Sequence, residues 1–316
     1  MTDIEILSPA GDEKSFYAAI NNGANAIYLG LQNFNARNKA QNFSLENLSC
    51  YVDIAHLFNV KIYVVMNTLI TNEETFELLK LVEGAIHSKV DAFIVQDIGV
   101  ATLLKHTFKG INLHASTQMG IHSLNGAKVA ESLGFTRIVL SREVTKQDII
   151  EIKNNTNLEL EFFVHGALCV SFSGNCYLSS LCSNESGNRG RCLQPCRLKY
   201  LSNFNGKQLK NGYLFSANDL CLIDKVKELK EFGITSFKIE GRLRRPSYVA
   251  YVTRMYSSAC NLSYKDNSVQ SKLRLENFKK LFNRGEYNTG FYLAGEPNKK
   301  VINSSYQNHR GIEIGY

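Results

Sequence analysis

Six of the eight cysteines are clustered within 53 positions, at Cys169, Cys176, Cys182, Cys192, Cys196 and Cys221. In a reducing compartment, thiols gathered in this way indicate a metal site or an iron–sulfur cluster rather than a disulfide framework. Six residues separate Cys169 from Cys176, and three separate Cys192 from Cys196. Neither spacing is the C-x2-C pair of a structural zinc ribbon, so a [4Fe–4S] cluster is favoured and zinc remains the alternative. Three arginines that would stabilise an anionic cluster flank the second pair: Arg189, Arg191 and Arg197.

Three side chains at the ends of apolar runs are candidates for acid–base catalysis: His165, Lys238 and Glu240. His165 and Glu240 each emerge directly from an apolar segment, where desolvation shifts a pKa. Lys238 is expected on the same strand face as Glu240, because side chains alternate along a strand. For His165 the alternative is a histidine of the core, and for Glu240 it is an ion pair with Arg242.

Eight short apolar runs, rich in Ile, Val, Phe and Tyr, predict the strands that must position these groups. Segments with helical spacing lie between them. The alternation predicts an α/β fold, a (β/α)8 TIM-like barrel, and an open doubly wound sheet is the alternative. The predicted strands are Glu5–Ser8, Ala26–Gly30, Lys61–Met66, Ala92–Gln96, Ile111–Ala115, Arg137–Ser141, Leu158–Val164 and Ser236–Glu240.

Several local signals mark the ends of the predicted helices. Thr71 and Glu74 form a capping box before a helical segment, and Pro246 fits the first turn of the last helix. Three glycines each end a helix and precede a strand: Gly23, Gly134 and Gly233. The other helices are predicted at Asp12–Asn22, Ser44–Phe58, Ile98–His106, Ile121–Leu133, Lys146–Lys153 and Asp219–Phe232.

Polar residues follow nearly every predicted strand. A barrel places its active site at the carboxyl ends of its strands, so this ring of polar ends indicates a binding pocket. Some members can serve only to cap helices, as Thr71 and Asp97 would. Arg142 and Arg242 offer bidentate donors for a carboxylate or a phosphate. The side chains expected to bind substrate are Arg37, Asn67, Gln96, Gln118, Arg142 and Arg242.

The seventh connection of the barrel, residues 166–216, is too long for a simple strand-to-helix loop and holds most of the cysteines. We therefore expect a cysteine-rich insertion after strand 7, within a barrel that covers residues 1–260. Residues 261–316 are predicted to form a polar helical segment and a short β tail. The helical segment is Ser271–Asn283, and the tail includes Asn288–Tyr292 and Gly311–Gly315.

The net charge of +7 is unevenly distributed along the chain. Residues 1–180 hold 13 Lys and Arg against 18 Asp and Glu, a net charge of −5. Residues 181–316 hold 23 against 11, a net charge of +12. This asymmetry indicates an anionic partner for the second part of the chain. Nucleic acid is the usual candidate, and a solvated basic face without a partner is the alternative.

Composition and missing motifs exclude several classes of protein. With 44% hydrophobic and 21% charged residues, the chain is not a disordered, collagen-like or coiled-coil sequence. The apolar runs are too short to span a bilayer, and the amino terminus lacks a signal-peptide pattern, which predicts a cytoplasmic protein without a membrane partner. The sequence contains no zinc-protease, nucleophile-elbow, Walker A or dinucleotide-binding motif.

Several segments resemble the collagenase-like peptidase family thirty-two of the unassigned class. They are Leu7–Gly11, Gly23–Gly30, Gln41–Phe43, His165–Cys169, Ser173–Cys176, Asn188–Arg197, Ser216–Cys221 and Ser236–Arg242. The resemblance extends over roughly residues 4–312. It implies a barrel that carries a [4Fe–4S] cluster. The implied ligands are Cys169, Cys176, Cys192 and Cys196, with Cys221 as an alternative fourth ligand.

Within that family, the sequence looks most like the branch that hydroxylates RNA. This branch makes 5-hydroxyuridine at the tRNA wobble position and depends on prephenate, and a relative modifies ribosomal RNA. The resemblance therefore implies an enzyme with tRNA as partner and prephenate as co-substrate. The chain resembles a short form, which implies that a longer paralogue acts with it. Two alternatives stay open: a collagenase-like peptidase, and a non-catalytic tRNA-binding partner of the longer paralogue.

Overall fold

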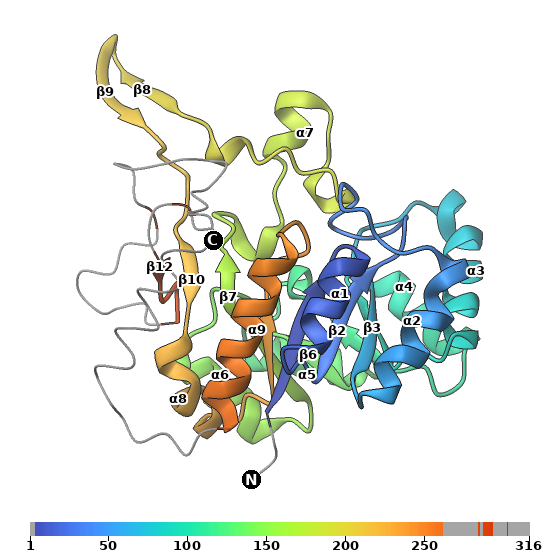
Figure 1. Ribbon diagram of the computed structural model, residues 1–316. Coiled ribbons are helices and arrows are strands. Elements are labelled where there is room, and N and C mark those ends of the chain that lie inside the picture. The colour runs from blue at the N-terminus through green and yellow to red at the C-terminus, as the bar shows by residue number, and fades with distance from the viewer. Residues whose placement is uncertain (1–3, 262–283, 285–286, 293–301, 303–316) are drawn as a thin grey trace.

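A closed ring of eight parallel strands forms the centre of the computed structural model (Figure 1). The structure describes residues 4–261, 284, 287–292 and 302. Each strand of the ring pairs with the next, and the last strand closes the ring by pairing with both the first and the seventh. The strands are β1 (Glu5–Ala10), β2 (Ala26–Gly30), β3 (Lys61–Met66), β4 (Ala92–Val95), β5 (Leu113–Ala115), β6 (Arg137–Val139), β7 (Glu159–Ala167) and β11 (Ser236–Ile239).

Helices cover the outside of this ring and alternate with its strands (Figure 1). Their inward faces pack on the apolar outer faces of the strands to form the core. The predicted (β/α)8 barrel is thus confirmed, and the pairing of β7 with β11 excludes an open sheet. The helices are α1 (Glu13–Ile20), α2 (Leu45–Leu57), α3 (Thr75–His87), α4 (Ile98–Thr107), α5 (Leu124–Ser132), α6 (Lys146–Asn155), α8 (Val226–Glu231) and α9 (Pro246–Asn261).

The predicted helix boundaries follow from local chemistry. Gly23, Gly134 and Gly233 have φ angles of +88°, +81° and +89°. This left-handed conformation ends a helix, and glycine adopts it at the lowest cost. The backbone N–H of Thr71 donates to the Glu74 carboxylate at 2.8 Å, which confirms the predicted capping box.

One predicted helix, Asp219–Phe232, is wrong in its first part. Residues Asp219–Cys221 form strand β10, which pairs antiparallel with the end of β7 outside the barrel. Strand β7 extends beyond its pairing with β6, and β10 provides partners for the backbone groups of this extension. A 3-10 turn at Ile223–Lys225 follows, so that α8 begins only at Val226.

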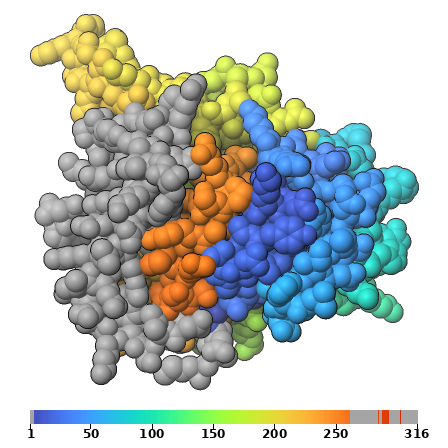
Figure 2. Space-filling model, viewed as in Figure 1, coloured from blue at the N-terminus to red at the C-terminus, as the bar shows by residue number. Residues whose placement is uncertain are grey.

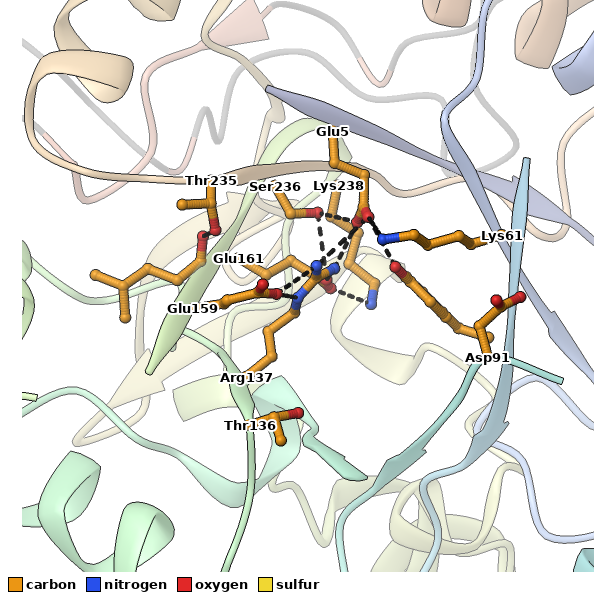
Figure 3. A network of polar contacts seen from close by, with 12 residues as sticks. Glu5, Lys61, Asp91, Thr136, Arg137, Glu159, Glu161, Thr235, Ser236 and Lys238 are labelled. Atoms are coloured by element: carbon orange, nitrogen blue, oxygen red, sulfur yellow. Dashed lines mark hydrogen bonds and ion pairs between the residues drawn. The ribbon is translucent and has the colours of Figure 1, made fainter. Parts of the chain in front are cut away.

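The amino-terminal end of the barrel interior is filled by a charged network (Figure 3). Arg137 is 4% exposed, and its Nη1 lies 2.5 Å from Glu5 Oε1 and 3.2 Å from Glu161 Oε2. Its Nη2 lies 2.6 Å from Glu159 Oε2. Lys238 Nζ lies 2.6 Å from Glu161 Oε1. Each buried charge therefore has an opposite partner, as burial of ions requires.

The predicted cysteine-rich insertion follows β7 and lies over the carboxyl ends of the barrel strands (Figure 1). It contains helix α7 (Leu178–Ser183) and a two-stranded hairpin of β8 (Tyr200–Phe204) and β9 (Lys207–Gly212). The hairpin was not predicted. It projects from the rest of the molecule as the yellow arm in Figures 1 and 2.

Part of the predicted β tail is also present. Strand β12 (Tyr287–Asn288) pairs with β10 in parallel. The predicted segments Ser271–Asn283 and Gly311–Gly315 lie outside the described residues, and the domain boundary at residue 260 stays a prediction. Within the described part of the chain, no helix has the length and apolar character needed to cross a membrane.

Candidate functional site

A pocket of about 180 Å³ lies between the carboxyl ends of the barrel strands and the cysteine-rich insertion. This is the end of a barrel at which active sites form. The predicted residues Gln96, His165 and Cys221 do not line it. Eleven others do: Arg37, Asn67, Gln118, Arg142, Lys238, Glu240, Arg242, Cys169, Cys176, Cys192 and Cys196.

Glu240, directly after β11, forms an ion pair with Arg37 in the connection after β2. The Arg37 Nη2 atom lies 3.0 Å from Glu240 Oε1. Although burial opposes ionisation, Arg37, Arg142 and Arg242 together lower the pKa of Glu240 to about 2. Glu240 is therefore a carboxylate at neutral pH and has no proton to donate. Glu240 thus forms an ion pair, but with Arg37 and not with Arg242, the partner that was considered.

Two other arginines of the pocket act on Glu240 through their charge but form no ion pair with a described residue. Arg242 is 5% exposed, and its Nη1 has no acceptor among the described residues. Arg142 lies 4.5 Å from the centre of the Phe163 ring, and within the described chain it has neither a hydrogen bond nor an ion pair. A Cβ on Gly30 would lie 2.4 Å from Arg242 Nη1, so a glycine there makes room for the guanidinium. Such a pair of arginines suits a carboxylate or a phosphate.

Lys238 connects the pocket to the charged network beneath it. Its Nζ contacts Glu161 at 2.6 Å and lies 4.5 Å from the centre of the Tyr28 ring. Burial lowers the pKa of Lys238, although Glu161 opposes the shift. As predicted, Lys238 and Glu240 face the same space. The contact with Glu161 therefore fixes the position of the Lys238 amine, and burial makes this amine easier to deprotonate.

The amides Asn67 and Gln118 form a bridge across the pocket wall. Asn67 Nδ2 donates to Gln118 Oε1 at 2.9 Å, and Asn67 Oδ1 accepts from the backbone N–H of Ala36 at 3.0 Å. These bonds hold the segment that carries Arg37 against the ends of β3 and β5. Asn67 and Gln118 consequently position the charged groups of the pocket in addition to lining it.

Two of the four pocket cysteines accept a hydrogen bond from the backbone amide two residues further on. Leu178 N–H donates to Cys176 Sγ at 3.3 Å, and Gln194 N–H donates to Cys192 Sγ at 3.3 Å. Amide hydrogen bonds to sulfur stabilise cysteine thiolates and tune iron–sulfur clusters. The local backbone thus provides a hydrogen-bond donor to each of these two sulfur atoms.

The other three pocket thiols influence Cys196 electrostatically. Burial raises the pKa of Cys196 to about 11; Arg197 opposes this shift, and Cys169, Cys192 and Cys176 add to it. Thiols that resist joint ionisation become thiolates when a metal centre supplies positive charge. No three His, Cys, Asp or Glu side chains in the described ranges converge as ligands of one metal ion. The four cysteines share one pocket, and their role as ligands of a four-iron cluster, in which each thiolate binds a different iron, stays a prediction.

Three contacts, which the sequence analysis missed, hold the insertion in place. Within the insertion, Arg197 is buried, and its Nη2 donates to the backbone oxygen of Leu168 at 2.6 Å. Ser173 Oγ donates to Glu143 Oε2 at 2.9 Å. Arg189 Nη2 lies 2.5 Å from Glu74 Oε1 at the start of α3. The arginines expected to face a cluster are therefore used in part to fasten its loop.

His165 lies outside the pocket, among the rings of three tyrosines. Its ring centroid is 6.0 Å from Tyr248, 5.7 Å from Tyr256 and 5.1 Å from Tyr287. Burial lowers the pKa of His165 to about 3, so the imidazole is neutral at pH 7. The pairing of β7 with β11 is irregular between Lys238 and Ile239. Side chains of β7 therefore do not alternate regularly between its two faces here, and His165 does not face the pocket. Its catalytic role stays a prediction, and its position favours a structural one.

The remaining two predicted site residues also lie apart from the cysteines. Cys221 is directly opposite His165 in the β7–β10 pairing, and burial raises its pKa to about 12. Gln96 follows β4 and is buried; no donor from the described residues reaches its Oε1 atom. The roles considered for these residues stay predictions.

Comparison with known protein families gives one match over most of the chain. The profile of "Peptidase family U32" matches residues 11–302. An uncharacterized protease of Methanocaldococcus jannaschii is 38% identical, with all of this chain and 80% of that protein aligned. The 23S rRNA 5-hydroxycytidine synthase of Escherichia coli is 38% identical over 89% of this chain and 44% of its own length. The tRNA hydroxylation protein P of Helicobacter pylori is 35% identical over 97% of this chain and 75% of its own length.

A solved structure supports the same architecture. A U32 peptidase has a TM-score of 0.51 over 76% of this chain and 93% of its own, at 13% sequence identity. At that identity the likeness concerns the fold alone. It agrees with the closed barrel seen here.

Proposed function

The chain belongs to peptidase family U32, and on this basis we propose that it is an iron–sulfur enzyme that hydroxylates RNA. The proposed substrate is the wobble uridine of tRNA, the product 5-hydroxyuridine and the co-substrate prephenate. One observation carries the proposal: four cysteines line the same pocket as two arginines that form no ion pair with a described residue. Relatives named for hydroxylation of tRNA and of ribosomal RNA support this chemistry, while two others are named a protease and a collagenase.

Cys169, Cys176, Cys192 and Cys196 would hold the [4Fe–4S] cluster. Such a cluster supplies one-electron redox chemistry when bound. The amides of Leu178 and Gln194 would stabilise the thiolates through the bonds they already make. Cys221 is a weaker candidate for the fourth ligand, because it lies outside the pocket.

The arginines of the pocket would bind the organic acid. Arg142 and Arg242 offer donors to a carboxylate, while Arg37 is held in place by Glu240. Prephenate carries two carboxylates, which matches a pocket with more cations than anions. Lys238 is the residue best placed to hold or release a proton, because burial reduces its preference for the charged form.

The positive charge of residues 181–316 supports an RNA substrate. Their net charge of +12 contrasts with −5 for residues 1–180. A polyanion gains affinity from such a surface through the release of its counterions. A cytoplasmic location would agree with a tRNA substrate and stays a prediction.

The peptidase alternative finds less support in the geometry. A cysteine peptidase needs a thiolate beside a histidine. Cys221 and His165 are cross-strand neighbours, but both are buried and lie outside the pocket. With its pKa raised to about 12, Cys221 is a thiol at neutral pH and a poor nucleophile.

The proposal is tested by cluster content and by tRNA analysis. Protein purified without oxygen should contain about four irons and four sulfides per chain and show a broad visible absorption band. Deleting the gene, together with any longer paralogue, should remove 5-hydroxyuridine and its derivatives from the wobble position. The wild-type gene should restore it, and Cys192→Ala should not.

Two results would overturn the proposal. A colourless protein that contains zinc or no metal, and that cleaves gelatin, would favour the peptidase. Binding of tRNA by a metal-free protein that restores the modification only with its longer paralogue would favour the non-catalytic partner.

A further inference from the structure

The β8–β9 hairpin extends from the insertion with little support from the barrel (Figures 1 and 2). Every residue from Asn203 to Asn211 is exposed, including Phe204 at 65%. The turn is formed by Asn205 and Gly206 with φ angles of +48° and +75°, the left-handed geometry of a tight hairpin turn. The exposed ring at the tip of this arm offers a face on which a nucleic-acid base can stack.

The strand pairing places aromatic and cationic side chains on one face of this hairpin. Phe204 is directly opposite Lys207, and Ser202 is directly opposite Lys210. Residues opposite each other in an antiparallel pair share a face, and alternate residues of one strand do the same. The register shifts at a bulge between Ser202 and Asn203, so Lys207 and Lys210, three positions apart, both lie opposite residues of one face of β8. Phe204, Lys207 and Lys210 therefore lie on one surface, with Tyr200 at its base.

The charge of this region has one sign. No Asp or Glu occurs from residue 186 to residue 218. Lys207 and Lys210 have no ion pair with any described residue. The sequence of this stretch contains six cations: Arg189, Arg191, Arg197, Lys199, Lys207 and Lys210. Arg189 and Arg191 pair with Glu74 and Glu185, and Arg197 is buried. The cations that form no ion pair with a described residue are Lys199, Lys207 and Lys210. Such cations beside an exposed aromatic ring are typical of single-stranded nucleic-acid binding.

The base of the hairpin is attached to the cysteine loop. Tyr200 OH donates to the backbone oxygen of Pro195 at 2.9 Å, and the Tyr200 ring lies 5.4 Å from the Phe215 ring in an edge-on contact. Pro195 and its neighbour Cys196 both line the pocket. The base of the hairpin therefore adjoins the pocket, and a ligand bound along the hairpin would lie next to it.

We propose that the β8–β9 hairpin is an arm that binds the unpaired part of the RNA substrate. Phe204 stacks on a base, and Lys207 and Lys210 contact the adjoining phosphates. This inference rests on the proposed RNA substrate and adds the surface that receives it. A protein partner or a second copy would have to be acidic to suit the same face, and the charge of the hairpin favours RNA.

The test measures the binding of an unmodified tRNA transcript to the full-length protein as a function of salt. We expect Phe204→Ala to weaken binding about tenfold, the scale of one lost base stack, and Phe204→Tyr to restore it. Lys207→Gln with Lys210→Gln should reduce the slope of log affinity against log salt by about 1.4, or roughly 0.7 for each lost phosphate contact.

Matched controls use the same chemical changes elsewhere. Leu201→Ala also removes an exposed apolar side chain but from the opposite face of the hairpin, and should leave tRNA affinity unchanged. Lys109→Gln with Lys128→Gln removes two charges outside the hairpin, before β5 and on α5. Iron content and melting temperature should stay at the wild-type values in all these variants, because the hairpin is exposed.

The outcomes separate this inference from the function on which it rests. If the wild-type protein binds tRNA and the hairpin variants bind it with the same affinity, the inference about the hairpin is overturned and the proposed function is not. A wild-type protein that binds no tRNA at low salt overturns both. Self-association that disappears in Phe204→Ala assigns the hairpin to a second copy of the chain and overturns the RNA assignment.

Discussion

Glu240 forms its ion pair with Arg37, 203 positions away in the sequence, and not with Arg242, which follows it by two residues. This choice leaves Arg242 Nη1 without an acceptor among the described residues. Burial and the nearby charge of Arg37 lower the pKa of Arg242 to about 10. An anion that enters the pocket would relieve both effects, since it supplies the missing acceptor and the missing charge.

Replacing Arg242 should weaken the binding of the acid co-substrate. We expect Arg242→Gln to raise the dissociation constant of prephenate by about 10- to 100-fold, the scale of a lost hydrogen bond to a charged group. Titration calorimetry measures this change. Arg254→Gln, on the exposed side of α9, is the control and should bind like the wild type. If both variants bind prephenate with the same affinity, the acid does not bind at Arg242.

The four pocket cysteines should be required for iron, and the other cysteines should not. We expect Cys196→Ala to lose most of the bound iron and visible absorbance, because it removes a ligand of the pocket group. Cys221→Ala should keep both, because Cys221 lies outside the pocket. Cys182→Ala, at an exposed position, is the control for surface thiols. Loss of iron in Cys221→Ala but not in Cys196→Ala would reverse this ligand assignment.

The network beneath the pocket should depend on its buried carboxylate. Glu161 is fully buried and contacts both Arg137 and Lys238. Glu161→Gln should lower the free energy of unfolding by about 3–5 kcal/mol, because it leaves buried positive charge without its partner. Glu159 contacts the same arginine but is 55% exposed, so Glu159→Gln should cost about 1 kcal/mol or less. Urea unfolding compares the two, and equal losses would contradict the role of burial.

The sequence predicted the barrel because buried strands have a strong local signature. The apolar runs from Lys61 to Met66 and from Ala92 to Gln96 needed no long-range information. The clustered cysteines and the arginines that follow strands could also be identified from local sequence. Residue type and position relative to a strand are enough to place them at one end of a barrel.

Other features depended on contacts that local patterns do not specify. The spacing suggested Arg242 as the ion-pair partner of Glu240, but the partner is Arg37, which lies in a loop far away in the sequence. His165 was expected to face the pocket, but the irregular pairing of β7 with β11 moves it away. The hairpin was missed because its strands bury no apolar face, although Asn205-Gly206 is a typical turn sequence.

The position of His165 predicts how stability depends on pH. The pKa of His165 is about 3 in the folded protein and near 6.5 when unfolded, so the unfolded state binds the proton more readily. The contribution of this residue is therefore complete above pH 6.5 and is lost as the pH falls from 6.5 toward 3. Within that range, His165 lowers the free energy of unfolding by up to about 1.4 kcal/mol for each pH unit that the pH falls.

His165→Phe should therefore make the free energy of unfolding less sensitive to acid, whatever it changes at neutral pH. Urea unfolding at several values between pH 4.5 and pH 7.5 measures the slope. A reduced slope should remain in the variant, because His114 is also buried and its pKa is lowered well below the ordinary value. His122→Phe, at a more exposed position outside the core, should keep the full wild-type slope. A slope that is the same in all three proteins would mean that His165 binds its proton in the folded state and is available for acid–base chemistry.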